Sequence, residues 1–267
     1  MKVLSFIILF SMQVSAQELF VMTEPASNMP TGSIGARVSQ SLLKEQLKSG
    51  YNYHVMPEIM YGFSKNLMVH ANAFVSNRNT SLVSEGGSLY AKYRVFSIDD
   101  IHSHLRIASY GRASYNNSDI HQEEIETMGH NSGFETGLVA TQLINKLAIS
   151  SSIAYEKAFD NSSKNPFPDS LNNSATNYTL SFGHLVYPKT YTTLKQTNIN
   201  VMLEFLGQKL NGTSKSYLDV APSIQFIINS QARIDLAYRQ QIYSDMLRTA
   251  PNGFYLKLEY TFFNIGN

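Results

Sequence analysis

The stretch Gly253–Phe263 reads Gly-Phe-Tyr-Leu-Lys-Leu-Glu-Tyr-Thr-Phe-Phe and indicates the fold class. Every second residue from Phe254 to Phe262 is apolar or aromatic, whereas the residues between them include Lys257 and Glu259. A period of two residues is that of a strand, because successive side chains in a strand point to opposite faces. The stretch therefore predicts a strand with one apolar face and one partly charged face.

The same stretch ends on Tyr260-x-Phe262, close to the end of the chain. In this it resembles the C-terminal recognition signal of bacterial outer-membrane β-barrels. The resemblance implies that Gly253–Phe263 binds the barrel-assembly machinery and pairs with the first strand, which would leave no open sheet edge.

Further stretches with the same alternation precede it, among them Leu67–Val75, Ile199–Phe205 and Ile234–Tyr238. Together they make about twelve strands, an even number of the size found in bacterial single-chain barrels. The chain is therefore predicted to be all-β, a single antiparallel transmembrane β-barrel of about twelve strands.

The spacers between these stretches differ in length. Residues 63–66, 143–146 and 229–231 are tight, whereas residues 76–86, 115–130 and 157–174 are long and polar. Outer-membrane barrels have short periplasmic turns and longer external loops. If the chain starts in the periplasm, each of these tight spacers falls on the periplasmic side.

The N-terminus has the features of a signal peptide. Lys2 is followed by the apolar run Val3–Phe10 and by the small residues of Val14-Ser15-Ala16. Such a segment is too short to span a bilayer as a helix, and no later run approaches the roughly 20 apolar residues that a helix needs. We expect residues 1–16 to be a signal peptide and residues 17–267 to form the barrel of an integral protein of the Gram-negative outer membrane, in contact with its lipid.

The composition excludes several classes of site and partner. The chain has no cysteine, so it has no disulfide, no lipid-modified cysteine anchor and no cysteine metal ligand. The net charge of +1 argues against a nucleic-acid partner. Aromatic residues make up 12%, which suits a barrel with aromatic girdles.

A short motif carries a family resemblance. It is Pro57-Glu58-x-x-Tyr61-Gly62-x-x-x-Asn66-Leu67, with a looser second copy over residues 222–238. The motif resembles outer-membrane barrels that include the phenol-degradation MetA-like proteins. With Glu24-Pro25-Ala26-Ser27 near the start, the chain looks most like barrels of this kind from Bacteroidota. The resemblance implies an envelope location and transport, and it supplies no catalytic residues.

The polar faces of the predicted strands carry charges of both signs. They can form the lining of a polar channel, or they can close the lumen by pairing with one another, since a charge avoids being buried alone. The predicted lumen-lining residues are Glu58, Lys92, Arg94, Arg106, Arg112, Glu135, Glu156, Glu204, Arg233, Asp235, Arg239, Lys257 and Glu259.

The predicted external loop Asp119–His130 is the densest cluster of metal-ligating residues. Imidazole and carboxylate suit Zn²⁺ or Cu²⁺, and a thioether suits Cu⁺. In an extended segment alternate residues share a face. The candidate ligands are His121, Glu124, Glu126, Met128 and His130. The alternative is a solvated acidic loop that binds no metal, and no other cofactor is indicated.

The pair His130 and Ser132 is the one feature that suggests an enzyme. Residues two apart lie on one face of a strand, here outward towards lipid with Phe134. The pair resembles the His-x-Ser of outer-membrane phospholipase A, which implies a serine activated by histidine for ester hydrolysis. Asn161 is the nearest candidate for the third residue, but the Asn-Gly-Arg continuation is missing.

The sequence thus favours a small-solute channel or a transport-associated envelope protein, which is not an enzyme. Two alternatives stay open. One is a lipid-active serine hydrolase that uses His130 and Ser132, and the other is a structural or metal-sensing barrel that binds through Asp119–His130.

Overall fold

The structure is a computed structural model that describes residues 20–46, 50–78, 81–100, 103–190, 193 and 195–263. The predicted signal peptide, residues 1–16, lies outside the described residues. The described part of the chain forms twelve strands. They are β1 (Ile34–Lys44), β2 (Tyr51–Gly62), β3 (Leu67–Ser76), β4 (Val83–Asp99), β5 (Ser103–Asn116), β6 (Gly133–Ile144), β7 (Leu147–Ala158), β8 (Ser174–Tyr187), β9 (Asn198–Leu210), β10 (Ser216–Ile228), β11 (Ala232–Ser244) and β12 (Asn252–Phe262).

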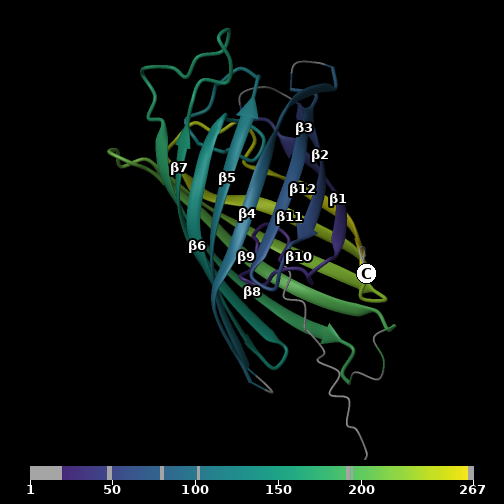
Figure 1. Ribbon diagram of the computed structural model, residues 1–267. Coiled ribbons are helices and arrows are strands. Elements are labelled where there is room, and N and C mark those ends of the chain that lie inside the picture. The colour runs from purple at the N-terminus through teal and green to yellow at the C-terminus, as the bar shows by residue number, and fades with distance from the viewer. Residues whose placement is uncertain are drawn as a thin grey trace, which may run out of the picture.

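The strands close into an antiparallel barrel (Figure 1). Each strand pairs with its neighbours in sequence, and β1 also pairs with β12 from Ile34 opposite Phe262 to Lys44 opposite Asn252. The strand predicted over Gly253–Phe263 is thus the strand that removes the sheet edge. The predicted all-β barrel is confirmed.

The alternation of side chains separates an apolar exterior from a polar interior. Leu89, Ile59 and Phe254 on the outer face are 67%, 64% and 62% exposed, whereas Lys92 and Glu204 on the inner face are 0% exposed. An apolar outer belt of this extent suits a bilayer and would be a liability in water. No helix in the described residues is long and apolar enough to cross a membrane.

The two rims of the barrel differ. At the turn end, β6–β7 and β10–β11 are joined by tight turns, in which Asn145, Asn229 and Ser230 have φ of 53°, 53° and 55°. Two successive residues with positive φ are typical of the hairpin turn whose twist matches the strands. At the opposite rim, the loop end, residues 77–82, 117–132 and 159–173 connect the strands.

The predicted alternation of spacer lengths holds for the spacers named above but is not strict. Residues 188–197 form a long connection at the turn end, and residues 211–215 form a short one at the loop end. The topology therefore depends on the order of the strands rather than on the length of every spacer.

Two segments occupy the interior. Residues 20–29, the N-terminal segment, precede β1, and their purple trace lies within the ring of strands in Figure 1. Residues 117–132, the inner loop, connect β5 to β6 at the loop end. The prediction of an external loop is wrong for most of its length, since Glu124, Thr127 and His130 are 6%, 0% and 4% exposed.

Candidate functional site

The charged residues predicted to line the lumen all occupy inward-facing positions of their strands. Most are buried or half-buried because each faces the opposite wall or one of the two inner segments. Arg94 is half-buried near the turn end of β4, on the same face as Lys92. The members of the set that line the central cavity are Glu58, Arg112, Glu135, Glu156, Arg239 and Lys257.

Ion pairs join many of these charges across neighbouring strands. The Arg112 guanidinium lies 2.9 Å from Glu135, and that of Arg239 lies 2.6 Å from Asp219. Arg233 lies 2.9 Å from Glu259. Pairing of this kind offsets the cost of burying each charge. The lumen wall is thus both charged and cross-linked, which combines the two interpretations of the sequence.

Glu204 of β9 binds the start of the N-terminal segment. Its carboxylate accepts hydrogen bonds from the backbone N–H groups of Val21, Met22 and Thr23, each at 2.9 Å, and from the Thr23 hydroxyl at 2.8 Å. Hydrogen bonds to an ionised carboxylate are about twice as strong as those between neutral groups. One side chain of the wall therefore holds three successive residues of the segment.

Other strands hold the rest of this segment. The Lys92 ammonium group donates to the carbonyl oxygens of Pro25 at 2.5 Å and Ser27 at 2.8 Å. The backbone N–H of Ala26 donates to the Thr141 hydroxyl at 2.9 Å. Lys257 of β12 donates to the carbonyl oxygen of Val21. The segment is bound to the wall from several sides and occupies the lumen towards the turn end.

The inner loop is bound to the opposite part of the wall. Gln208 accepts from the Ile125 N–H at 2.9 Å and donates to its carbonyl oxygen at 2.7 Å. Glu156 accepts from the Thr127 N–H at 2.6 Å. Together these contacts hold the middle of the loop inside the barrel.

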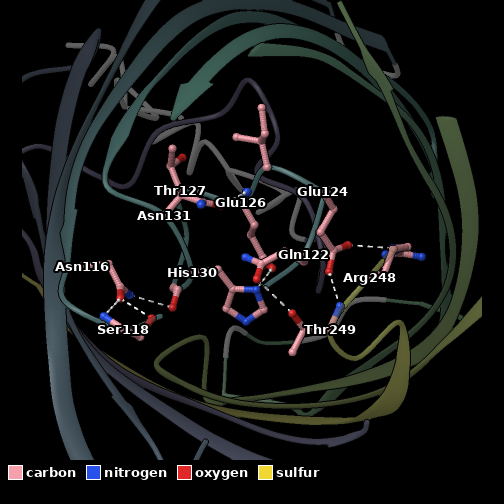
Figure 2. A network of polar contacts seen from close by, with 12 residues as sticks. Asn116, Ser118, Gln122, Glu124, Glu126, Thr127, His130, Asn131, Arg248 and Thr249 are labelled. Atoms are coloured by element: carbon pink, nitrogen blue, oxygen red, sulfur yellow. Dashed lines mark hydrogen bonds and ion pairs between the residues drawn. The ribbon is translucent and has the colours of Figure 1, made fainter. Parts of the chain in front are cut away.

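Arg248, from the connection between β11 and β12, ties the inner loop to β10. Its guanidinium donates to Glu124 at 2.6 Å and to both carboxylate oxygens of Asp219, at 2.7 and 2.8 Å. Figure 2 shows Arg248 and Thr249 on one side of the loop and Asn116 and Ser118 on the other. The loop thus occupies the lumen towards the loop end.

A cavity of about 250 Å³ lies between the two segments. It is slightly smaller than the roughly 300–1,000 Å³ of pockets for drug-sized ligands, so its size suits a small solute. The N-terminal segment contributes Met22, Thr23 and Glu24, and the inner loop contributes Glu126 and His130. The wall adds aromatic side chains from four strands, namely Tyr90, Tyr110, Tyr217 and Tyr255.

Two of the titratable groups of the inner loop that line this cavity have shifted pKa values. Burial raises the pKa of Glu126 to about 7, with the nearby Glu124 carboxylate adding to the shift. Burial also lowers the pKa of His130 well below its ordinary value, and the charge of Arg78 lowers it further. His130 is therefore neutral at pH 7, and Glu126 changes its charge close to pH 7.

The structure does not support the predicted orientation of His130 and Ser132. Both are buried, at 4% and 5% exposure, instead of facing lipid. The Ser132 hydroxyl donates to the Asn116 carbonyl oxygen at 3.0 Å and accepts from the Asn116 N–H at 2.8 Å. Asn161 accepts from the Ser132 N–H and donates to the His130 carbonyl oxygen, at 2.7 and 2.9 Å. These contacts join the loops to one another and leave the serine without a histidine base.

The predicted metal ligands of Asp119–His130 do not converge. A turn over residues 126–131, with the His130 N–H donating to the Glu126 carbonyl oxygen at 3.1 Å, breaks the extended conformation that would place them on one face. The side chain of His121 is 65% exposed, whereas Glu124 is engaged by Arg248. Glu126 lies 3.3 Å from His130, and Met128 lines the central cavity with them.

Sequence reasoning missed several residues of the lumen. Arg37 stands in the alternation of β1 and pairs with Glu24 at 2.9 Å and Glu58 at 2.7 Å. Its place in that pattern was a usable signal. The sequence signal for Asp219 and Arg248 is weaker, because Arg248 lies in a connection between strands and its partners come from distant parts of the chain.

Comparison with known proteins concerns the fold. No family model matches the chain, and no curated protein matches it. Among solved structures, the COG4313 outer membrane channel from Pseudomonas putida F1 is similar at 14% identity and a TM-score of 0.56, over 91% of this chain and 99% of that one.

Two porins are also similar, with lower scores. The KdgM porin matches at 13% identity and a TM-score of 0.46, over 86% of this chain and 99% of that one. The NanC porin matches at 9% identity and a TM-score of 0.48, over 85% and 98%. The match to the COG4313 channel, with its TM-score of 0.56, shows that this chain has the fold of an outer-membrane β-barrel channel.

Proposed function

We propose that the protein is an outer-membrane channel for small solutes, and that its lumen is closed by the N-terminal segment and the inner loop. The cavity of about 250 Å³ between these two segments carries the proposal. Its wall presents charged groups of both signs together with tyrosine side chains. Such a lining suits polar solutes, which a lipid bilayer excludes. The fold that the chain shares with a COG4313 outer membrane channel supports the same function.

Passage requires that at least one inner segment moves. The N-terminal segment is the better candidate, because side chains of the wall hold its backbone and its contacts with Glu204, Lys92 and Lys257 can exchange for water. The inner loop is joined to strands at both ends, and it carries the buried Arg248–Glu124 pair. We infer that the N-terminal segment is the gate and that the inner loop forms the constriction.

The remaining expectations belong to the same proposal. We propose that the turn end faces the periplasm, that lipid covers the apolar belt, and that Gly253–Phe263 is the segment the barrel-assembly machinery binds. We also propose kinship with the MetA-like barrels and an origin in Bacteroidota, on the motif that begins at Pro57. The protein has no catalytic role in this proposal.

The test compares solute flux through the folded chain with flux through two variants. Glu204→Gln removes the charge that binds residues 21–23, whereas Asp235→Asn removes an inward carboxylate that pairs with Arg233 of the same strand and is not among the residues that line the central cavity. We expect weak swelling of liposomes that contain the parent chain, several-fold faster swelling with Glu204→Gln, and parent-like swelling with Asp235→Asn. Small sugars and amino acids serve as probes.

Folding is checked by the different migration of boiled and unboiled samples. If folded parent and folded Glu204→Gln both leave the liposomes impermeable to every probe, the channel function is wrong. Equal swelling by the parent and both variants would support a channel, but it would show that the N-terminal segment is not its gate.

A further inference from the structure

A second cavity lies at the turn end of the lumen, beside the N-terminal segment. It has a volume of about 40 Å³, and its lining includes Met29 of that segment, Met60 of β2, and Met68 and His70 of β3. Met60 is directly opposite His70 in the β2–β3 ladder. Met68 precedes His70 by two positions and so shares its face. The ladder therefore brings two thioethers and one imidazole into one small space.

The tip of a third methionine reaches the same place. A Cβ at Gly35 of β1 would lie 2.6 Å from the terminal methyl carbon of Met60 and 3.3 Å from that of Met29. Both tips thus meet over the bare backbone of Gly35. Any larger residue at this position would push the two side chains apart.

His70 has one occupied and one open nitrogen. Its Nδ1 lies 2.6 Å from a carboxylate oxygen of Glu58. The whole residue is only 4% exposed, and its buried Nε2 has no hydrogen-bond partner among the described residues. A buried polar atom without a partner is costly and needs an explanation. A carboxylate that accepts a hydrogen bond from one ring nitrogen is also the usual partner of a histidine that binds a metal ion through the other nitrogen.

We propose that Met29, Met60, Met68 and His70 form a binding site for one soft monovalent metal ion of the Cu⁺ type. Thioether sulfur selects Cu⁺, whereas hard cations such as Mg²⁺ and Ca²⁺ require oxygen ligands. The space exceeds the roughly 10–15 Å³ that one water molecule occupies by the same measure, so one ion fits.

The charges around the cavity balance one another. Arg37 and Arg233 line the cavity together with Glu24 and Glu259, and both arginines are held in ion pairs, at 2.9 Å from Glu24 and 2.9 Å from Glu259. Glu58, on the ligating histidine, adds one negative charge, and Lys92, 3.9 Å from Glu24, adds one positive charge. The surroundings are therefore neutral and give no added attraction to a divalent ion.

The site differs in kind from the one expected in the inner loop. In the described residues no group of three or more His, Asp or Glu is arranged to hold a metal ion. The site at the turn end instead rests on sulfur, with the imidazole as its only nitrogen donor. We therefore expect binding of Cu⁺ and Ag⁺ and no comparable binding of Zn²⁺.

The test is a competition titration of the folded full-length barrel in detergent. Cu⁺ is supplied under reducing conditions against a chromogenic Cu⁺ chelator, and Ag⁺ serves as a soft ion that keeps its oxidation state. We expect one ion per barrel in the parent and at least a roughly tenfold weaker affinity in Met60→Leu/Met68→Leu, on the scale of losses at metal sites. Met202→Leu replaces another buried lumen methionine and should bind as the parent does.

A second variant keeps all four donors and changes only the space. Gly35→Ala should weaken binding because the new methyl group displaces the tips of Met29 and Met60, which are flexible enough for the barrel to fold. X-ray absorption at the copper edge should show sulfur and nitrogen ligands in the parent. The proposal is overturned if the folded parent binds no stoichiometric Cu⁺ or Ag⁺, or if Met60→Leu/Met68→Leu binds as tightly as the parent. Neither result depends on whether the barrel conducts solutes.

Discussion

The two segments inside the lumen are held by different chemistry. The N-terminal segment is bound mostly through its backbone, with Glu204 accepting three N–H groups and Lys92 donating to two carbonyl oxygens. The inner loop is bound through charged side chains as well, with Arg248 between the carboxylates of Glu124 and Asp219. Apart from the Glu24–Arg37 pair, the contacts of the N-terminal segment are hydrogen bonds that water can replace one at a time, whereas a buried ion pair loses a great deal when one partner is removed. The first arrangement suits a part that moves, and the second suits a part that stays.

The largest expected effect is at Arg248. Arg248→Ala leaves the buried Glu124 carboxylate without its arginine and leaves Asp219 with Arg239 alone, which should cost about 3–5 kcal/mol in the free energy of unfolding. Lys215→Ala is the control, because Lys215 pairs with Glu123 of the same loop and its side chain is 42% exposed, so about 0–1 kcal/mol is expected. Urea unfolding of the refolded barrel in detergent measures both. Similar losses for the two variants would contradict the distinction between a fixed loop and a movable segment.

A pair of engineered cysteines can immobilise each segment in turn. The hydroxyls of Thr23 and Ser181 lie 3.0 Å apart, and the chain has no cysteine, so Thr23→Cys/Ser181→Cys creates one possible disulfide between the N-terminal segment and β8. Oxidation should reduce solute flux in liposomes to background, and dithiothreitol should restore it. Gln122→Cys/Thr249→Cys is the pair for the inner loop, where the Thr249 hydroxyl lies 3.1 Å from the side-chain oxygen of Gln122. A cysteine is shorter than glutamine, so a short thiol-to-thiol cross-linker joins this pair. Cross-linking it should change flux little. If it stops flux while the disulfide between positions 23 and 181 does not, the inner loop is the gate.

The smallest expected effect is a dependence of stability on pH that comes from two groups of the inner loop. Burial raises the pKa of Glu126 from 4.5 to about 7, so its contribution to stability is complete below pH 4.5 and is lost as the pH rises through 7. Burial lowers the pKa of His130 below 6.5, so its contribution is complete above pH 6.5 and is lost as the pH falls. The two trends oppose each other in the parent. Burial alone would raise the pKa of Glu24 in the N-terminal segment, but Arg37 and other cations hold this pKa well below 4.5. Glu24 therefore adds no dependence of stability on pH between pH 4.5 and 7.

Single variants separate the two trends. Relative to the parent, Glu126→Gln should become more stable as the pH rises from 4.5 to 7, and His130→Gln should become less stable over the same range. Urea midpoints at three pH values within this range give the measurement. If the difference between each variant and the parent is constant with pH, neither group titrates as its burial requires.

The local sequence pattern was sufficient to predict the strands that form the wall of the barrel. The period of two residues in Gly253–Phe263 predicts β12 and its outward face, because the direction of a side chain in a strand depends only on its position. The same rule places Glu58, Lys92 and Glu204 inside. The rule also applies to Arg37, which the predicted set of lumen-lining residues did not include.

The contents of the lumen were not predictable in this way. The segment around Glu24 carries no alternation, and Asp119–His130 is polar enough to suggest a solvated loop. His70 and Met60 lie in predicted strands, but nothing in either strand alone shows that they face each other across a small cavity. Only the register of β2 against β3 and the entry of Met29 from the N-terminal segment bring them together.

By itself the sequence determined that this chain forms a closed all-β barrel with a charged interior, because apolar alternation, turn residues and a terminal strand act over a few residues each. The tertiary structure alone decided which charges meet and what fills the barrel. Glu204 binds Val21 across 183 positions of sequence, and Arg248 binds Glu124 across 124. Such contacts depend on the closure of the whole barrel. The local sequence fixes that a side chain points inward, but only the closed barrel determines which partner it contacts there.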